Sequence, residues 1–175
     1  MEPLTELRRA APETARLQVT ALYQAHALGL VRLAVLMVGD QPTAEDVVQE
    51  AFLGLYRRWS ALKDPERALA YVRSSVLNGC RMAFRTQSRH DKIALAAPED
   101  VESAEATALL GEANREVIAA LRRLPARQRE AVVLRYYLDM TEDQAARAMQ
   151  VSRGTVKSAT SRGLAALARL LKEEP

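Results

Sequence analysis

The sequence predicts an all-α protein built from two small helical domains. Ala, Leu, Arg and Glu dominate a chain of 175 residues, whereas Gly and Pro number seven each and aromatic residues make up 5%. This composition favours helices over strands. Apolar residues recur at helical spacing, and no segment alternates in the manner of a strand. The length is sufficient for one domain or two small ones.

The distribution of charge divides the chain into three parts. Residues 1–92 hold 13 basic and 10 acidic residues, residues 93–114 hold five acidic and no basic residues, and residues 115–175 hold 12 basic and seven acidic residues. Two basic blocks joined by an acidic segment indicate two modules that face a polyanion. The expected parts are a tail at 1–16, a first domain at 17–92, a flexible acidic linker at 93–107 and a second domain at 108–175.

Three helices are predicted for the first domain, over residues 17–38, 43–59 and 66–88. Gly39 suits the C-terminal end of the first helix, and Asp40 or Gln41 precedes Pro42 near the start of the second. Residues 1–16 are polar and form either a loose tail or a short helix. The second helix has an apolar stripe of Val48, Phe52, Leu55, Tyr56 and Trp59.

Four helices are predicted for the second domain, over residues 108–123, 126–138, 141–149 and 152–172. The second of them is expected to turn Ala131, Leu134, Tyr137 and Leu138 inward. Thr141 and Gln144 form a capping-box pattern at the start of the third helix, and Ser152 caps the last one. Two capped helices separated by a short turn predict a helix-turn-helix at residues 141–170.

The outward face of the last helix carries the residue types that contact duplex DNA. Lys157 can reach guanine or phosphate, and Ser158 and Ser161 are short enough to allow close approach. Arg153 and Arg162 are suited to binding phosphate and fixing the register. The alternative is a solvated helix face, but the pair of capped helices favours DNA contact.

The first domain combines an acidic helix face with a basic, aromatic segment. Residues 40–50 hold four acidic and no basic residues, which indicates a protein partner because DNA would repel this surface. Residues 57–92 hold nine basic residues, and aromatic residues lie among them. This mixture is typical of surfaces that hold unstacked bases. Core positions are the alternative interpretation for Phe52 and Trp59.

Several functional classes are disfavoured by the sequence. A single cysteine, Cys80, excludes an internal disulfide and a cysteine-based zinc site. His26 and His90 lie in unlike contexts, and no metal-spaced cluster, phosphate-binding glycine loop or nucleophile motif is present. The start lacks a basic-then-apolar leader, and the longest apolar run, at 33–38, is too short for a bilayer. We expect a soluble, cytoplasmic, non-enzymatic protein with no metal or cofactor and no membrane association.

Three motifs resemble those of one family in their order and spacing. Residues 46–52 (DVVQEAF) are similar to the DxxQExF motif in region 2 of extracytoplasmic-function (group IV) sigma factors of RNA polymerase. Residues 124–130 (LPARQRE) resemble the family's LPxxQRE stretch in region 4, and residues 152–158 (SRGTVKS) resemble the start of its recognition helix. The resemblance covers roughly residues 20–172. The sequence of the last motif is similar to that of an actinobacterial, SigE-like subfamily.

The resemblance implies a promoter-recognition protein that binds core RNA polymerase at its β′ clamp helices and β flap. It implies that region 2 binds polymerase and reads the −10 element, while region 4 reads the −35 element as duplex. The polymerase-binding residues would be Asp46, Gln49 and Glu50. The −10 residues would be Trp59, Lys63, Arg67, Tyr71, Asn78 and Arg81. The −35 residues would be Arg153, Thr155, Lys157, Ser158, Ser161 and Arg162. An anti-sigma partner that clamps between the two domains is also implied.

Two other classes of protein fit the sequence less well. An ordinary transcription regulator with a terminal helix-turn-helix would explain residues 141–170 equally well. It would not explain an acidic face at 46–50 beside a basic, aromatic segment. An enzyme is disfavoured because no recognisable catalytic constellation is present.

Overall fold

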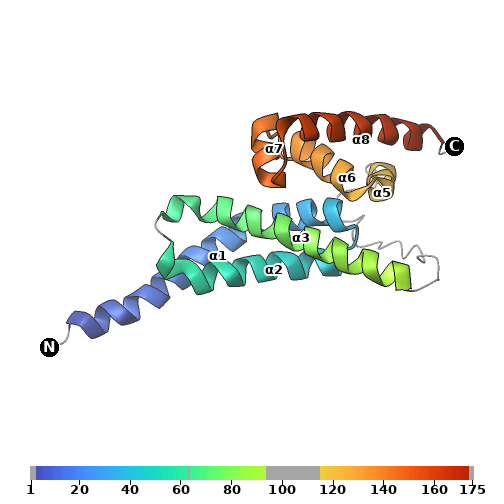
Figure 1. Ribbon diagram of the computed structural model, residues 1–175. Helices are drawn as coiled ribbons and strands as arrows, with labels where there is room; N and C mark the ends of the chain where they lie inside the picture. The colour runs from blue at the N-terminus through green and yellow to red at the C-terminus, as the bar shows by residue number, and fades with distance from the viewer. Residues whose placement is uncertain (1–2, 63, 94–114, 174–175) are drawn as a thin grey trace.

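The computed structural model describes residues 3–62, 64–93 and 115–173, and over these ranges the chain is helical without a strand. The first domain consists of α1 (Pro3–Val38), α2 (Gln41–Arg58) and α3 (Ala68–Ile93), with the 3-10 turns η1 (Trp59–Ala61) and η2 (Pro65–Arg67) between α2 and α3. The second domain consists of α5 (Arg115–Arg123), α6 (Ala126–Val132), the π-helical turn η4 (Val133–Tyr137), α7 (Glu142–Met149) and α8 (Arg153–Glu173). The all-α prediction is confirmed (Figure 1).

The boundary between α1 and α2 forms as the sequence predicts. Gly39 adopts a φ of +93°, a left-handed conformation that ends α1 at little steric cost. Asp40 is the N-cap of α2, and its carboxylate accepts a 2.9 Å hydrogen bond from the backbone N–H of Thr43. The start of α1 differs from expectation: residues 3–16 belong to the same helix as residues 17–38.

The first domain buries one face of each of its three helices. The last turns of α1 are buried at every position from Leu33 to Val38, and they pack against α2 and α3. Val48 and Leu55 of α2 and Val76 of α3 fill the space between the helices with at most 1% of their surface exposed. The core position of Phe52 is confirmed, whereas Tyr56 is 43% exposed and lies outside the core.

The second domain places α8 across α6 and α7. The crossing is close because Gly163 of α8 faces Val132 and the backbone of Gln128 on α6. Leu134, Ala145 and Val156 are fully buried where these helices meet. The helix-turn-helix therefore rests on a packed base formed by α5 and α6.

A π-helical turn replaces the end of the helix predicted at 126–138. In this turn the backbone N–H of Leu138 bonds to the carbonyl of Val133, five residues earlier. The extra residue per turn rotates the following side chains. Ala131 and Leu134 point inward as predicted, but Tyr137 is 41% exposed and the prediction of an inward position is wrong for it.

The two domains are docked against each other. Figure 1 shows the second domain lying over α1 and α3, and α1 contacts α5, α6 and η4. One apolar cluster runs through both domains. The predicted linker at 93–107 lies outside the described residues except for Ile93, and the helix predicted at 108–123 is described from Arg115.

One described helix has the length and composition of a membrane span. It is the part of α1 from Glu13 to Val38, whose most apolar window has a mean hydropathy of 1.5. The turns from Leu33 to Val38 are buried in the bundle, so their apolar character is explained by the core of the first domain.

Candidate nucleic-acid and protein interfaces

The turn between α7 and α8 is fixed by side-chain caps at both helix starts. Thr141 and Gln144 form the predicted capping box, with Thr141 Oγ1 accepting from the Gln144 N–H at 3.2 Å and Gln144 Oε1 accepting from the Thr141 N–H at 2.8 Å. Gln150 ends α7 in the left-handed conformation. Ser152 Oγ then accepts a 3.1 Å hydrogen bond from the Thr155 N–H at the start of α8. These caps set the direction in which α8 leaves the turn.

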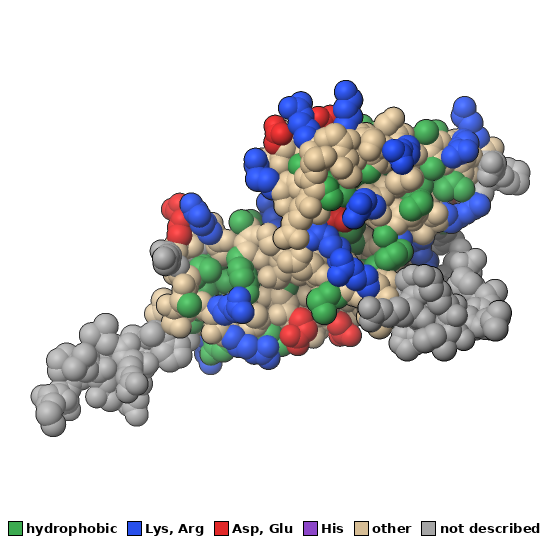
Figure 2. Space-filling model, in the orientation of Figure 1, with side chains coloured by type: hydrophobic (Ala, Val, Ile, Leu, Met, Phe, Trp, Pro, Cys, Tyr) green, Lys and Arg blue, Asp and Glu red, His purple; other side chains and the backbone are tan. Residues whose placement is uncertain are grey.

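The six residues predicted for duplex DNA all lie on the first three turns of α8. Arg153, Lys157, Ser161 and Arg162 are exposed, while Thr155 and Ser158 are half-buried. The Ser158 hydroxyl donates to the Thr155 carbonyl at 3.1 Å, so it is partly engaged by its own helix. Figure 2 shows basic side chains along the outer edge formed by α7 and α8.

Arg153 is held against α7 by two carboxylates. Its Nε donates to Glu142 Oε2 at 2.8 Å, and a second guanidinium nitrogen lies 4.0 Å from Asp143 Oδ2. The hydrogen bond from Arg153 lowers the pKa of Glu142, and the same bond raises the pKa of Arg153. The guanidinium stays two-thirds exposed, so a phosphate can compete for it.

The acidic face of α2 adjoins an apolar groove. Asp46, Gln49 and Glu50 are all exposed, and Figure 2 shows acidic side chains gathered over α2. Gln49 also lines a groove of about 410 Å³ with Leu53, Tyr56 and Tyr23 of α1. Sequence reasoning missed Leu53, although it follows Gln49 by four residues and therefore shares its helix face.

Of the six residues predicted for the −10 element, the five that the structure describes lie in η1, η2 and α3. Trp59 is half-buried against the core, and Arg67 is exposed in a 3.3 Å ion pair with Asp64. Tyr71 is half-buried, with its hydroxyl turned toward Gly54 of α2. Lys63 lies outside the described residues.

Asn78 and Arg81 are the two members of this set that the structure brings into contact. Arg81 donates to Asn78 Oδ1 at 2.7 Å. Its Nε donates at 2.8 Å to Glu130 of α6, and its second terminal nitrogen bonds both Glu130 and, at 2.5 Å, the carbonyl of Ala148. The side chains of Arg81 and Glu130 are 20% and 10% exposed. No local sequence signal pairs Arg81 with a residue 49 positions away, so sequence reasoning missed this contact.

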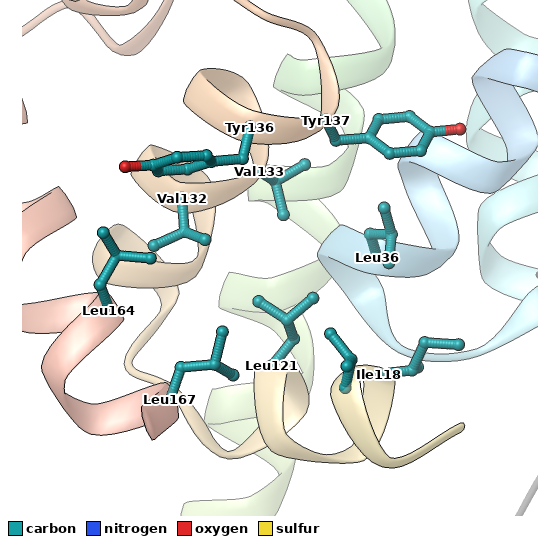
Figure 3. Close-up of a pocket in the computed structure, with 10 residues that line it drawn as sticks. Leu36, Ile118, Leu121, Val132, Val133, Tyr136, Tyr137, Leu164 and Leu167 are labelled. Carbon is teal, nitrogen blue, oxygen red and sulfur yellow. The ribbon is translucent and has the colours of Figure 1, made fainter. Parts of the chain in front are cut away.

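An apolar cavity of about 350 Å³ lies at another part of the domain boundary. Leu36 of α1 faces Ile118 and Leu121 of α5 across it, and Tyr136 and Tyr137 of the π-helical turn lie over its other side (Figure 3). The domain boundary is therefore part polar and part apolar. In the part of the chain whose side chains are described, no group of three acidic, histidine or cysteine residues is placed to hold a metal ion.

These surfaces define a class of protein. A helical bundle with an exposed acidic face, joined to a helix-turn-helix domain with an exposed basic face, is a two-module DNA-binding protein. Residues 22–90 match the family described as Sigma-70 region 2, and residues 114–167 match the family described as Sigma-70, region 4.

Relatives make the assignment more specific. The chain is 33% identical to the RNA polymerase sigma-E factor of Streptomyces coelicolor over 79% of its own length and 77% of the relative's. It is 32% identical to the ECF RNA polymerase sigma factor SigL of Mycobacterium tuberculosis over 94% of its own length and 93% of the relative's. The chain belongs to the sigma-70 family, as a sigma factor of the extracytoplasmic-function type, and its function is promoter-specific transcription initiation.

Solved structures agree in fold. The sigma factor RpoE of Bartonella quintana, solved in complex with the anti-sigma factor NepR, matches 85% of this chain with a TM-score of 0.62 at 22% identity. CnrH, solved in complex with the cytosolic domain of CnrY, matches 95% of this chain with a TM-score of 0.63 at 21% identity. At these identities the likeness concerns the fold alone.

Proposed function

We propose that this sigma factor uses oppositely charged surfaces for its two tasks. The acidic face of α2 binds core RNA polymerase, and the basic face of α8 binds the −35 element. The contrast between the two exposed faces carries this proposal, because a polyanion is attracted to one and repelled by the other. Region 2 corresponds to residues 17–92 and region 4 to residues 108–175, with residues 1–16 as an N-terminal tail that continues α1 and 93–107 as the linker.

The polymerase-binding residues in this proposal are Asp46, Gln49 and Glu50. All three are exposed on one stretch of α2, and the neighbouring groove offers exposed apolar surface at Leu53 and Tyr56. A charged rim beside an apolar patch is the usual composition of a protein interface. The partner is the β′ clamp helices of core polymerase, with the β flap as a second contact through region 4.

The DNA-binding residues divide between the two regions. Region 4 reads the −35 duplex, with Lys157, Ser158, Ser161 and Thr155 reaching base edges and Arg153 and Arg162 binding phosphates. Region 2 reads unstacked bases of the −10 element. The −10 residues are Trp59, Lys63, Arg67, Tyr71, Asn78 and Arg81, which combine basic, amide and aromatic side chains.

An anti-sigma factor and a cytoplasmic location belong to the same proposal. The solved neighbours are named as complexes, RpoE with an anti-sigma factor and CnrH with a cytosolic domain. The apolar cavity between α1 and α5 is a surface that such a partner could enter. The protein is a transcription factor without a catalytic step of its own.

Run-off transcription with purified core polymerase on a library of promoter fragments tests the proposal. Activity that depends on both proteins is expected, and the productive fragments report the −10 and −35 sequences. Absence of any association with core polymerase at low salt would contradict the proposal and leave a helical DNA-binding protein.

Two sets of variants separate the two surfaces. Asp46→Ala with Glu50→Ala should weaken core binding, while a control with Glu13→Ala and Glu116→Ala, which removes two exposed carboxylates elsewhere, should not. Equal core affinity of the two double variants would overturn the role given to α2.

The duplex-binding face of α8 has its own pair of variants. Lys157→Ala should weaken binding to −35 duplex and reduce the salt dependence of that binding by about one unit of slope, because one phosphate or base contact is lost. Lys172→Ala removes the same charge near the end of α8 and should have little effect. A loss of core affinity in Lys157→Ala would contradict the separation of tasks.

A further inference from the structure

Half of the sulfur-bearing residues of the chain line one cavity at the domain boundary. The sequence holds five methionines and one cysteine. Met37 of α1, Cys80 of α3 and Met149 of α7 all line a cavity of about 240 Å³, whose other walls come from α3, α6 and the end of α7. The three residues lie far apart in the sequence, so the fold and not a local motif brings them together.

All three of these residues are more than nine-tenths buried. Met37 and Met149 expose 7% of their surface, and Cys80 exposes 1%. Of the other methionines whose side chains are described, Met82 is 67% exposed and Met140 is half-buried, and neither lines the cavity. Methionine and cysteine often serve as core filling. A filled core contains few voids larger than a water molecule, whereas here a larger space remains beside the three residues.

Hydrogen bonds across the boundary fix two of the three residues in place. Arg81, the neighbour of Cys80, donates from its Nε to Glu130 of α6 at 2.8 Å. The same guanidinium donates to the carbonyl of Ala148, the neighbour of Met149, at 2.5 Å. The backbone positions of Cys80 and Met149 are therefore set by one shared side chain, although they belong to different domains.

Arg129 and Phe84 add a second contact between α6 and α3. Arg129 is buried at 4% exposure, and its guanidinium lies 5.0 Å from the centre of the Phe84 ring. Phe84 also lines the cavity. Charged side chains are rarely buried without a partner, so this contact belongs to the docked arrangement of the two domains. The cavity is therefore framed by two separate contacts and has a defined shape.

The chemistry of the three side chains selects a soft metal ion. Thiolate and thioether sulfur bind Cu(I), whereas Mg²⁺ and Ca²⁺ prefer oxygen ligands. Structural zinc sites are built from several thiolates and imidazoles, and the single cysteine of this chain argues against zinc, as the sequence predicts. A soft ion has no such requirement, because methionine sulfur can supply the remaining ligands.

The charges around the cavity distinguish a monovalent from a divalent ion. Three arginines, Arg81, Arg85 and Arg127, line the cavity with one carboxylate, Glu130. When a monovalent ion binds the Cys80 sulfur, the S–H bond breaks and the proton leaves to solvent, so one positive charge replaces another. A divalent ion would add a positive charge among the three guanidinium groups, and their repulsion opposes it. The site therefore favours Cu(I) over Zn²⁺.

We propose that Met37, Cys80 and Met149 form a binding site for one soft monovalent metal ion, Cu(I) or its analogue Ag(I). Cys80 binds as the thiolate, and the two methionines each donate a sulfur lone pair. The flexible methionine side chains can turn their sulfur atoms toward an ion in the cavity. Because Met37 and Cys80 belong to region 2 and Met149 belongs to region 4, the ion takes ligands from both domains.

Competition for Cu(I) against a chromophoric chelator, without oxygen, measures the affinity of the full-length protein. One ion per chain is expected. Cys80→Ala should abolish this binding, and Met37→Leu or Met149→Leu, which remove one sulfur at nearly constant volume, should each weaken it by at least about tenfold. Zn²⁺ should not displace the ion. Displacement by equimolar Zn²⁺ would overturn the choice of a monovalent ion.

Two methionines outside the cavity provide matched controls. Met82→Leu removes a thioether from an exposed position of α3, and Met140→Leu removes one from a half-buried position of region 4. Both should bind Cu(I) as the wild type does. Wild-type affinity in Cys80→Ala, or in both Met37→Leu and Met149→Leu, with an unchanged circular dichroism spectrum, would overturn the site.

Two measurements need no assumption about the folding of the variants that lose a ligand. X-ray absorption at the copper edge of the wild-type complex should show three sulfur neighbours, and a single sulfur neighbour would overturn the role of the methionines. Ag(I) should also raise the urea midpoint of the wild type, because an ion bound to the folded chain stabilises it. An unchanged midpoint at saturating Ag(I) would contradict a site that the fold assembles.

Discussion

Replacing Gly163 by alanine tests how closely α8 crosses α6. A Cβ at this position would lie 2.8 Å from Val132 Cγ2 and 3.2 Å from the backbone oxygen of Gln128. Carbon atoms in unstrained contact are about 3.5–4.0 Å apart, so one of the helices has to shift. Val132 is buried, and the Gln128 oxygen belongs to the backbone, so neither group can move aside freely.

Two opposing effects set the size of the change. Alanine stabilises a helix interior by about 1 kcal/mol relative to glycine. Overpacking in a filled core costs about 1–3 kcal/mol. The net expectation is a loss of about 1 kcal/mol in the free energy of unfolding of region 4, because the clash with a backbone atom puts the cost near the middle of its range.

Glycines at other positions provide matched controls for the same substitution. Gly29 of α1 has no atom within 4 Å of its Cβ position, so Gly29→Ala should stabilise the first domain by about 0.5–1 kcal/mol. Gly79 of α3 meets one side chain and no backbone atom, with Val47 Cγ1 at 2.8 Å and Val47 Cβ at 3.6 Å, so the effect of Gly79→Ala on stability should lie between those of Gly29→Ala and Gly163→Ala.

The measurement is urea unfolding followed by far-ultraviolet circular dichroism, with the two domains fitted separately where their transitions differ. In a Val132→Ala background the cost of Gly163→Ala should fall, because one of the two clashing groups is gone. Stabilisation by Gly163→Ala equal to that by Gly29→Ala would refute a close crossing of α6 and α8.

Three other predictions concern the capping box at Thr141, the buried thiol of Cys80 and the ion pair between Glu142 and Arg153. Thr141→Ala removes one half of the capping box and should lower the stability of region 4 by about 1 kcal/mol in the same unfolding assay, whereas Thr20→Ala on an exposed turn of α1 should change it little. Burial raises the pKa of Cys80 from 9.0 to about 12, so the folded protein retains the thiol proton over an interval in which the unfolded chain loses it. The free energy of unfolding should therefore fall as the pH rises above 9.0 toward 12, and the difference between wild type and Cys80→Ala at each pH isolates this effect; a difference that does not vary with pH would contradict it. Glu142→Gln should free Arg153 for a DNA phosphate and so increase both the affinity for duplex and the steepness of its salt dependence, measured by fluorescence anisotropy; weaker binding would indicate that Glu142 instead orients Arg153 for DNA.

The sequence predicted those features of the fold that depend on neighbours along the chain. The glycine end of α1, the capping box at Thr141 and the Ser152 cap each involve residues at most four positions apart, and the sequence narrowed the cap of α2 to Asp40 or Gln41. Such contacts follow from spacing alone. The motifs at 46–52, 124–130 and 152–158 predicted the family for the same reason.

Features that depend on distant contacts were not predictable in this way. The exposed position of Tyr137 results from one π-helical turn, whose extra residue shifts the register by an amount that no stripe of apolar residues indicates. Residues 124–130 identified a family motif, yet nothing in them indicated that Arg129 and Glu130 would be buried against α3. The groove beside Gln49 was likewise not predictable, because Tyr23 of α1 lines it together with residues of α2.

The composition of the domain boundary bears on how strongly the two domains are held together. An apolar boundary of the same extent would lose hydrophobic stabilisation on opening, at about 25 cal/mol for each Å² exposed, and would favour a permanently closed chain. The boundary of this protein is mixed: Leu36 meets Ile118 in an apolar cavity, whereas Arg81 and Glu130 form an ion pair whose members are each well hydrated once separated. The polar part of this boundary fixes the geometry of docking at little net gain in stability, while the apolar part supplies most of the free energy of docking. The balance between the two parts therefore decides how readily the domains can separate.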